Sequence, residues 1–138
     1  MALFGVFSTS GSALGVYRTW LDAISDNIAN INTARPTSQP AFQARYVVAR
    51  SNDAGAASGF ELPGGAQVQQ ITYGDPLGRV VNDPANPLAD AAGNVRMPDI
   101  DLGEQMTYLL LAQRGYQANL AVIERAKDSY QAALELGK

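Results

Sequence analysis

The chain has 138 residues, 46% of them hydrophobic and 17% charged, a length that suits one ordinary domain or a small core with appended helices. It contains no cysteine and no histidine, which excludes a disulfide framework, a zinc–thiolate site and the usual general base, so we expect neither a cofactor nor an enzymatic activity. The net charge is -3 and the arginines are scattered singly, so no basic stripe is available for nucleic acid or an anionic membrane surface.

The N-terminal segment, residues 1–33, carries a heptad pattern of apolar residues. Its positions are Leu14, Tyr17, Leu21, Ile24, Ile28 and Ile31, preceded by Leu3, Phe7 and Ser10 at the same spacing. Steps of three and four residues predict a helix from about Ser8 or Ser10, with a start weakened by glycines, to about Asn32 as a left-handed cap. The uncharged run before Arg18 is too short and too polar to cross a membrane, and it lacks the basic leader of a cleaved signal.

The middle segment, residues 34–100, holds all seven prolines, and its composition predicts a small β module with long loops. Alternation over 42–49 predicts a half-buried strand, and further strands are expected at 66–73, 79–81 and 95–97. The Gly74-Asp75-Pro76 turn separates two of these strands. Residues 52–59 are expected to form a flexible loop.

The C-terminal segment, residues 101–138, repeats the heptad pattern over a longer span. Its positions are Leu102, Met106, Leu109, Gln113, Tyr116, Leu120, Ile123, Lys127, Tyr130 and Leu134. Asp101 with Glu104 resembles a capping box, and Gly137 stands where a helix terminator belongs. Such a helix is about 54 Å long at 1.5 Å per residue, whereas a compact globule of this size is about 37 Å across.

The sequence therefore predicts an α+β fold in which long N- and C-terminal helices form a coiled-coil-like hairpin with a small inserted β module. The two seams fit a hairpin closed within one subunit and a coiled coil between subunits equally well. Two features favour assembly: the excess length of the second helix, and the run Tyr108–Ala112, whose apolar side chains wrap most of the way around it. Multi-sided packing within a single bundle would also satisfy this run.

The heptapeptide Asn27–Thr33 (NIANINT), at the end of the first predicted helix, resembles the signature of bacterial flagellar rod, hook and hook-associated proteins. The stretch Val80–Leu102 is similar to the region before the last helix in the C-type proximal rod proteins, and Arg114–Asn119 follows at the family spacing. The resemblance implies a structural subunit of the proximal rod of the basal body. Another rod or hook-type axial subunit is the alternative.

The resemblance also implies how such a subunit works and where it is found. Terminal helices would pack with copies of the chain and with other rod subunits around an axial channel, forming a tube that transmits torque. The subunit would reach the periplasmic rod through the flagellar type III export apparatus without a cleaved signal peptide, and without inserting into a membrane. The β module would lie outside the tube as a second layer of contacts.

The residues expected at the assembly interface lie on or beside the two seams. They are Leu14, Tyr17, Leu21, Ile24, Asn27, Ile28, Asn30, Ile31, Asn32, Thr33, Met106, Leu109, Tyr116, Asn119, Leu120 and Ile123. The amides of Asn27 and Asn30 could bond to a neighbouring chain and set its register. Asn30 and Asn32 could instead be local helix-ending residues, an equal alternative for Asn32 on its own. Tyr116 and Asn119 could be the matching contact on the other helix, or a core tyrosine and a solvated asparagine.

Carboxylate pairs offer a function of a different class, a glycan hydrolase. The candidate pairs are Asp99 with Asp101, and Asp83 with Asp90. Asp99 and Asp101 flank a predicted helix start, where acidic residues complement the helix dipole, and this favours a structural interpretation. The loop 90–94 has too few oxygen ligands for calcium, and the serines at 8–12 have no histidine to activate them.

Overall fold

A computed structural model describes residues 2–52 and 64–137 of the chain. The elements follow in the order α1 (Ala2–Asn30), β1 (Arg45–Ser51), β2 (Ala66–Tyr73), β3 (Arg79–Asn82), β4 (Asn94–Met97) and α2 (Leu102–Leu136). The prediction of an α+β fold with two long terminal helices and inserted β-strands is confirmed. The loop expected at 52–59 lies, beyond Asn52, outside the described residues.

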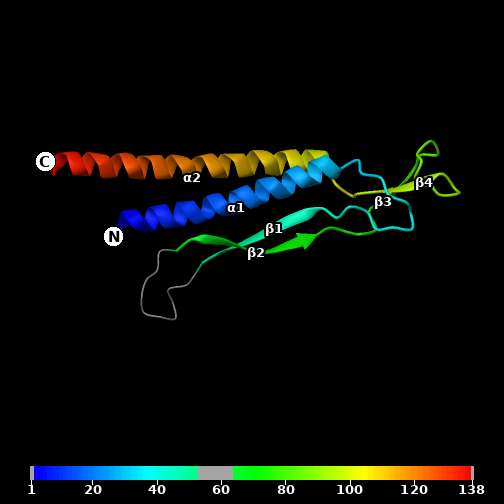
Figure 1. The fold of residues 1–138 in the computed structure, drawn as a ribbon, viewed down its shortest axis with the longest axis horizontal. Helices are drawn as coiled ribbons and strands as arrows, with labels where there is room; N and C mark the ends of the chain where they lie inside the picture. The colour runs from blue at the N-terminus through cyan, green and yellow to red at the C-terminus, as the bar shows by residue number, and fades with distance from the viewer. Residues whose placement is uncertain (1, 53–63, 138) are drawn as a thin grey trace.

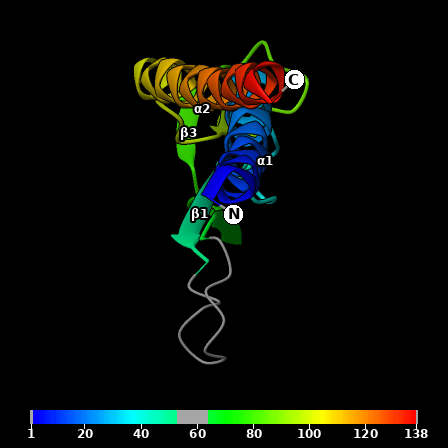
Figure 2. The same cartoon turned by 90° about the vertical axis from the view of Figure 1, so that its left-hand side faces the viewer.

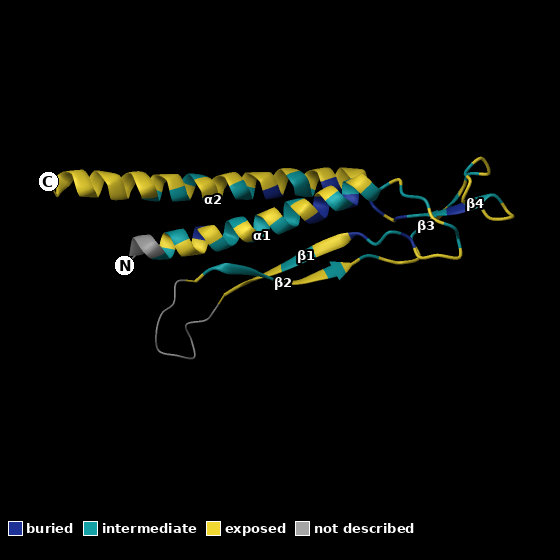
Figure 3. Ribbon diagram, in the orientation of Figure 1, coloured by how far each residue is buried: buried dark blue, intermediate teal, exposed yellow. Residues whose placement is uncertain are grey.

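The elements form three layers along one axis, with α1 in the middle (Figure 1). Helix α2 runs antiparallel to α1 on one side, and the β1–β2 hairpin lies along the opposite side of α1, as the end-on view also shows (Figure 2). The β3–β4 hairpin lies beyond the end of the helices. Because α1 is covered on two sides and α2 on one, α2 is the more exposed helix (Figure 3).

Helix α1 begins earlier and ends earlier than predicted. It starts at Ala2 because its first half packs on β2: the Ser12 hydroxyl accepts from the Ala66 N–H at 3.1 Å, and Thr9 donates to the Gly64 carbonyl. It ends at Asn30, where the Thr33 N–H donates to the Asn30 carbonyl at 2.9 Å. The left-handed cap expected at Asn32 is wrong, because positive φ angles among the described residues belong to glycines alone.

The β1–β2 hairpin contains a β-bulge that the sequence explains. Pairing passes from Val48 opposite Gln70 to Ala49 opposite Val68, so Gln69 is an extra residue. At the same place the apolar residues of β2 change from even-numbered positions, Ala66 and Val68, to odd-numbered positions, Ile71 and Tyr73. The bulge therefore keeps both apolar sets on one face of the hairpin, which a regular ladder could not do, although Ile71 and Tyr73 remain 40% and 61% exposed.

Strand β1 starts at Arg45 rather than at 42, because the preceding residues bond to the turn that follows β2. The Ala41 N–H donates to the Pro76 carbonyl and the Gly74 N–H donates to the Ala44 carbonyl, each at 2.8 Å. Ala41 and Ala44 are both buried. The strand predicted at 66–73 is confirmed, and those predicted at 79–81 and 95–97 become β3 and β4, one residue longer each.

The β3–β4 hairpin is held to the chain that follows α1 by Arg96. Its backbone forms an antiparallel bridge with Arg35, and its guanidinium donates to the carbonyls of Thr37 and Leu77. Gly78 has a φ of 54° and a Cβ there would lie 2.2 Å from the Met97 carbonyl oxygen, so only glycine fits.

Helix α2 begins at the predicted cap, since the Asp101 carboxylate accepts from the Glu104 N–H at 2.8 Å. Its 35 residues make it about 52 Å long, and its C-terminal end projects beyond α1 (Figure 1). Every residue from Lys127 to Gly137 is exposed. Within the described ranges, neither helix has an apolar stretch long enough to cross a membrane.

Candidate assembly interface

A buried pair of amides joins α1, β1 and α2. Asn27 is 1% exposed; its Oδ1 accepts from the Arg45 N–H at 2.8 Å and its Nδ2 donates to the Arg45 carbonyl at 3.0 Å. The same Nδ2 donates to Gln105 Oε1 at 3.0 Å. Beside it, Arg45 forms an ion pair with Asp26 in which both side chains are about half exposed, so it contributes little to stability.

These contacts fix the orientation of Gln105. The Arg45 N–H faces the oxygen of the Asn27 amide, and the Arg45 carbonyl faces its nitrogen, so the orientation of this amide is fixed. Because Nδ2 of Asn27 is a donor, the Gln105 atom that faces it is the acceptor Oε1. Gln105 Nε2 is therefore turned away from Asn27, and it is a buried donor with no acceptor among the described residues. A buried unpaired donor costs about 1–3 kcal/mol, which makes Gln105 a position where a further contact would stabilise the fold.

Small and polar side chains of α2 face α1 at intervals of seven residues. They are Gln105, Ala112, Asn119 and Ala126. Of the ten seam positions predicted on this helix, three are half-buried: Leu109, Tyr116 and Ile123. The other seven are exposed: Leu102, Met106, Gln113, Leu120, Lys127, Tyr130 and Leu134. The helices approach closely where Tyr17 packs on Gly115, since a Cβ on Gly115 would lie 2.4 Å from the Tyr17 ring.

An aromatic cluster lines the space between the helices and β1. The ring of Trp20 lies 6.3 Å from that of Tyr17 and 6.1 Å from that of Tyr108. The Tyr108 hydroxyl donates to Glu104 at 2.8 Å, and this hydrogen bond raises the pKa of Tyr108. Burial, followed by the negative charges of Glu104 and Asp99, raises the pKa of Tyr46 nearby.

Two adjoining cavities open on either side of Trp20, and we call them together the Trp20 groove. The first, of about 340 Å³, is lined by Ala13, Val16, Tyr17, Trp20, Val47, Ala49, Ala66 and Asn119. The second, of about 270 Å³, is lined by Trp20, Ile24, Arg45, Tyr46, Val47, Gln105 and Tyr108. Trp20 and Val47 belong to both linings, so the two cavities adjoin along α1.

The outer side of α2 presents apolar residues to solvent. Leu102, Met106 and Leu110 follow one another at four-residue steps and are 49%, 47% and 55% exposed. We call these three residues the outer row; Leu111, at 51%, lies on another side of the helix. An apolar row of this kind makes this side of α2 a candidate surface for contact with another molecule.

The residues predicted for assembly differ in how far their side chains are exposed. Those half-buried between layers or at the end of α1 are Leu14, Tyr17, Leu21, Ile28, Asn30, Ile31, Thr33, Leu109, Tyr116, Asn119 and Ile123. Asn32, Met106 and Leu120 are exposed. Ile24 and Asn27 are each 1% exposed, so in this arrangement they contact only their own chain. The bond expected from the Asn27 amide to a neighbouring chain is replaced by its three internal bonds.

The other amides also act locally. The Asn30 amide donates to the Asp26 carbonyl at 2.9 Å, and the Thr33 hydroxyl donates to Asn30 Oδ1 at 3.1 Å. Asn119 donates to the Gly115 carbonyl of its own helix at 2.9 Å, so the partner of Asn27 on α2 is Gln105 and not Asn119. Sequence reasoning missed Gln105; its seven-residue spacing with Ala112 and Asn119 was the available signal.

Three of the four carboxylates considered for catalysis, Asp83, Asp90 and Asp101, have structural partners. Asp101 caps α2. Asp83 accepts from the Asn86 amide at 3.2 Å. Asp90 accepts from the backbone of Asn94 and Ala92 and from the Thr37 hydroxyl, and these bonds hold the pKa of Asp90 below its usual value. Across residues 2–52 and 64–137, no group of three acidic side chains is placed to hold a metal ion.

Comparison with known proteins places this helical hairpin in a defined class. Residues 7–37 match the family model described as "Flagella basal body rod protein", and residues 91–136 match "Flagellar basal body rod FlgEFG protein C-terminal". Both matched regions contain the terminal helices and their flanks. The fold and its paired helices are therefore those of flagellar basal-body rod proteins.

Full-length relatives narrow this class. The chain is 36% identical over 140 residues to "Flagellar basal-body rod protein FlgC" of Escherichia coli O6:H1 and 35% identical over 139 residues to that of Salmonella typhimurium, with both partners covered completely. It is 30% identical over 150 residues to the protein of the same name from Bacillus subtilis, again over the whole of both chains. The chain belongs to the FlgC family of flagellar basal-body rod proteins.

Proposed function

We propose that this chain is a structural subunit of the proximal rod, and that it assembles through the exposed sides of its terminal helices into a torque-transmitting tube. The observation that carries the proposal is the unpartnered surface of α2, which combines the outer row with a projecting C-terminal end. A helix covered on one side gains stability when neighbours cover its other sides.

The proposed neighbours are copies of this chain and other rod subunits. Of the predicted interface residues, the exposed Met106 and Leu120 are assigned to contacts between subunits, whereas Ile24 and Asn27 are assigned to holding the subunit together. The β3–β4 hairpin, with Val80 57% exposed, would form the second layer of contacts. The division into segments 1–33, 34–100 and 101–138 describes these roles: two assembly helices and the β module between them.

Location and export complete the proposal. The subunit would act in the periplasmic part of the basal body after passing through the flagellar type III export apparatus without a cleaved signal. Membership of a family named for the rod supports this location, and a purely mechanical role agrees with the structural partners of Asp83, Asp90 and Asp101.

A single charge on the outer row tests the proposed interface. Leu110→Glu should leave the isolated subunit folded, because Leu110 is 55% exposed, but it should abolish rod assembly, because a buried unpaired carboxylate is strongly unfavourable. The measurement is swimming in soft agar together with electron microscopy of purified basal bodies.

The matched control is Ala118→Glu, which adds the same charge at an exposed position on another side of α2. Circular dichroism of both purified variants verifies that the helices are retained. Normal swimming and intact rods in the Leu110→Glu strain would contradict the proposed interface.

A further inference from the structure

The Trp20 groove has the properties of a binding site for a helix. Its floor consists of α1 residues from Ala13 to Ile24, a distance of about 17 Å along the helix axis. Its walls come from β1, β2 and α2, and the first cavity is almost entirely apolar. The second cavity includes Gln105, whose Nε2 has no acceptor among the described residues. A fitting occupant therefore brings apolar side chains, and it does not reach Gln105 Nε2, which is covered by its own chain.

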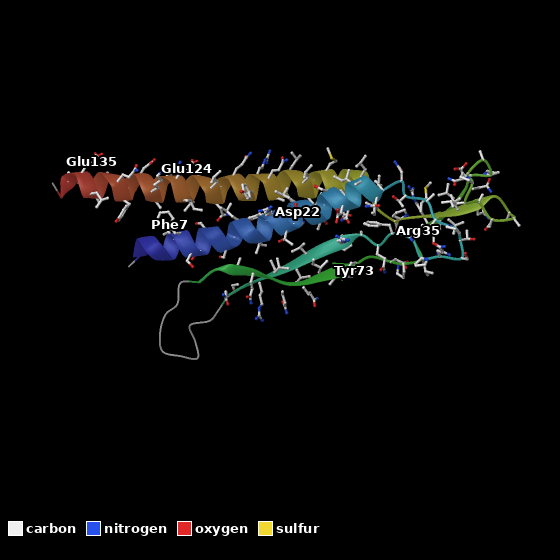
Figure 4. The ribbon with its side chains drawn as sticks, viewed as in Figure 1. Phe7, Asp22, Arg35, Tyr73, Glu124 and Glu135 are labelled. Atoms are coloured by element: carbon white, nitrogen blue, oxygen red, sulfur yellow. The ribbon has the colours of Figure 1, made fainter. Side chains whose placement is uncertain are left out.

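The projecting end of α2, Lys127–Gly137, meets these requirements. Its eleven exposed residues are about 15 Å long, which matches the groove floor. Tyr130 and Leu134 continue the seam that packs on α1 further along α2, yet they are 48% and 54% exposed. They lie one helical turn apart and so point to the same side. In Figure 4 the side chains of this end, with Glu135 near its tip, project beyond α1.

We propose that the projecting end of α2 from a second copy of the chain docks in the Trp20 groove. Leu134 packs in the first, apolar cavity, and the ring of Tyr130 packs beside Trp20 in the second. The inference rests on the proposed rod function and adds the identity of one contact within it. The two contacting surfaces differ, so each copy offers both, and such a contact builds a ring or an open helical array according to the rotation between copies.

The absence of cysteine allows a direct test by disulfide cross-linking. Two pairs join the surfaces: Leu134→Cys with Ala49→Cys, and Tyr130→Cys with Val47→Cys. The control pair is Leu134→Cys with Ala118→Cys, because Ala118 is an exposed residue outside the groove. Each pair is placed in one chain, basal bodies are purified from the flagellated strain and oxidised, and the products are separated by size.

The expected result is a ladder of dimers and larger multiples of this chain for both groove pairs, with no ladder for the control. Basal bodies that contain the variant but give no ladder for either pair, or a ladder equal to the control, would overturn the docking. A cross-link to a rod subunit of different mass would overturn the assignment to a second copy. If a cysteine pair impairs assembly, co-expression of the unsubstituted chain keeps the rods intact. Swimming is measured separately and reports on the proposed rod function itself.

Discussion

Asn27 connects three segments that are distant in the sequence. Through one buried amide it pairs with both backbone groups of Arg45 and with the side chain of Gln105, 78 residues away. Hydrogen bonds of this kind contribute about 1 kcal/mol each when made, and their partners are costly when left buried and unpaired. The heptad seam alone would align α1 and α2 in several registers, and this amide pair selects one of them.

Removing this amide should weaken the whole subunit. Asn27→Ala leaves three partner groups unpaired, the buried Gln105 Oε1 and the two part-buried backbone groups of Arg45, so we expect the free energy of unfolding to fall by about 3 kcal/mol. Urea unfolding of the purified subunit, followed by far-ultraviolet circular dichroism, measures this change. The control is Asn119→Ala, which removes a bond within one helix and should change stability by less than about 1 kcal/mol. Equal effects of the two substitutions would contradict the role given to Asn27.

At the scale of elements, the helices were predictable and their contacts were not. The heptad steps located both terminal helices, and Asp101 located the start of α2. The seam on α2 was assigned to its largest apolar residues, but Gln105 and Ala112 face α1 because close approach favours small side chains and the buried amide pair requires Gln105. Large residues such as Leu110 remain outside. Apolar periodicity alone does not distinguish a face that packs within the chain from one that packs between chains.

Glycines on the two helices should respond oppositely to alanine. Gly115→Ala should lower the free energy of unfolding by about 1 kcal/mol or more, because the new methyl group displaces Tyr17 from its stack with Trp20. Gly15→Ala is the matched control: nothing lies within 4 Å of its Cβ, so better helix propensity should raise stability by about 1 kcal/mol.

A chain that lacks the Tyr17 ring tests whether this ring causes the difference between Gly115→Ala and Gly15→Ala. In a Tyr17→Ala chain the obstruction is gone, and Gly115→Ala should then stabilise the subunit as Gly15→Ala does. Thermal unfolding of the four chains provides this comparison. A stabilising Gly115→Ala in the unsubstituted chain would show that the contact between Tyr17 and Gly115 is not a constraint.

For the whole molecule, length and shape account for the assignment to an assembly. The second helix is longer than a globule of this chain's size could cover, and the structure shows its last eleven residues exposed beyond α1. The sequence also indicated a β-rich middle, but not that it divides into two separate hairpins, one along α1 and one beyond the helices. That division depends on Arg45 bonding to Asn27 and on Arg96 bonding to Thr37, contacts between residues too distant in the sequence for local patterns to reveal.

The central claim is that the outer row of α2 becomes buried when the subunit joins the rod. Leu110→Cys places the only thiol of the chain in that row, and its rate of reaction with a maleimide can be compared in the isolated subunit and in purified basal bodies. The account predicts rapid modification of the isolated subunit and strong protection in basal bodies, with full reactivity restored on denaturation. Equal rates in the isolated and assembled states would contradict it.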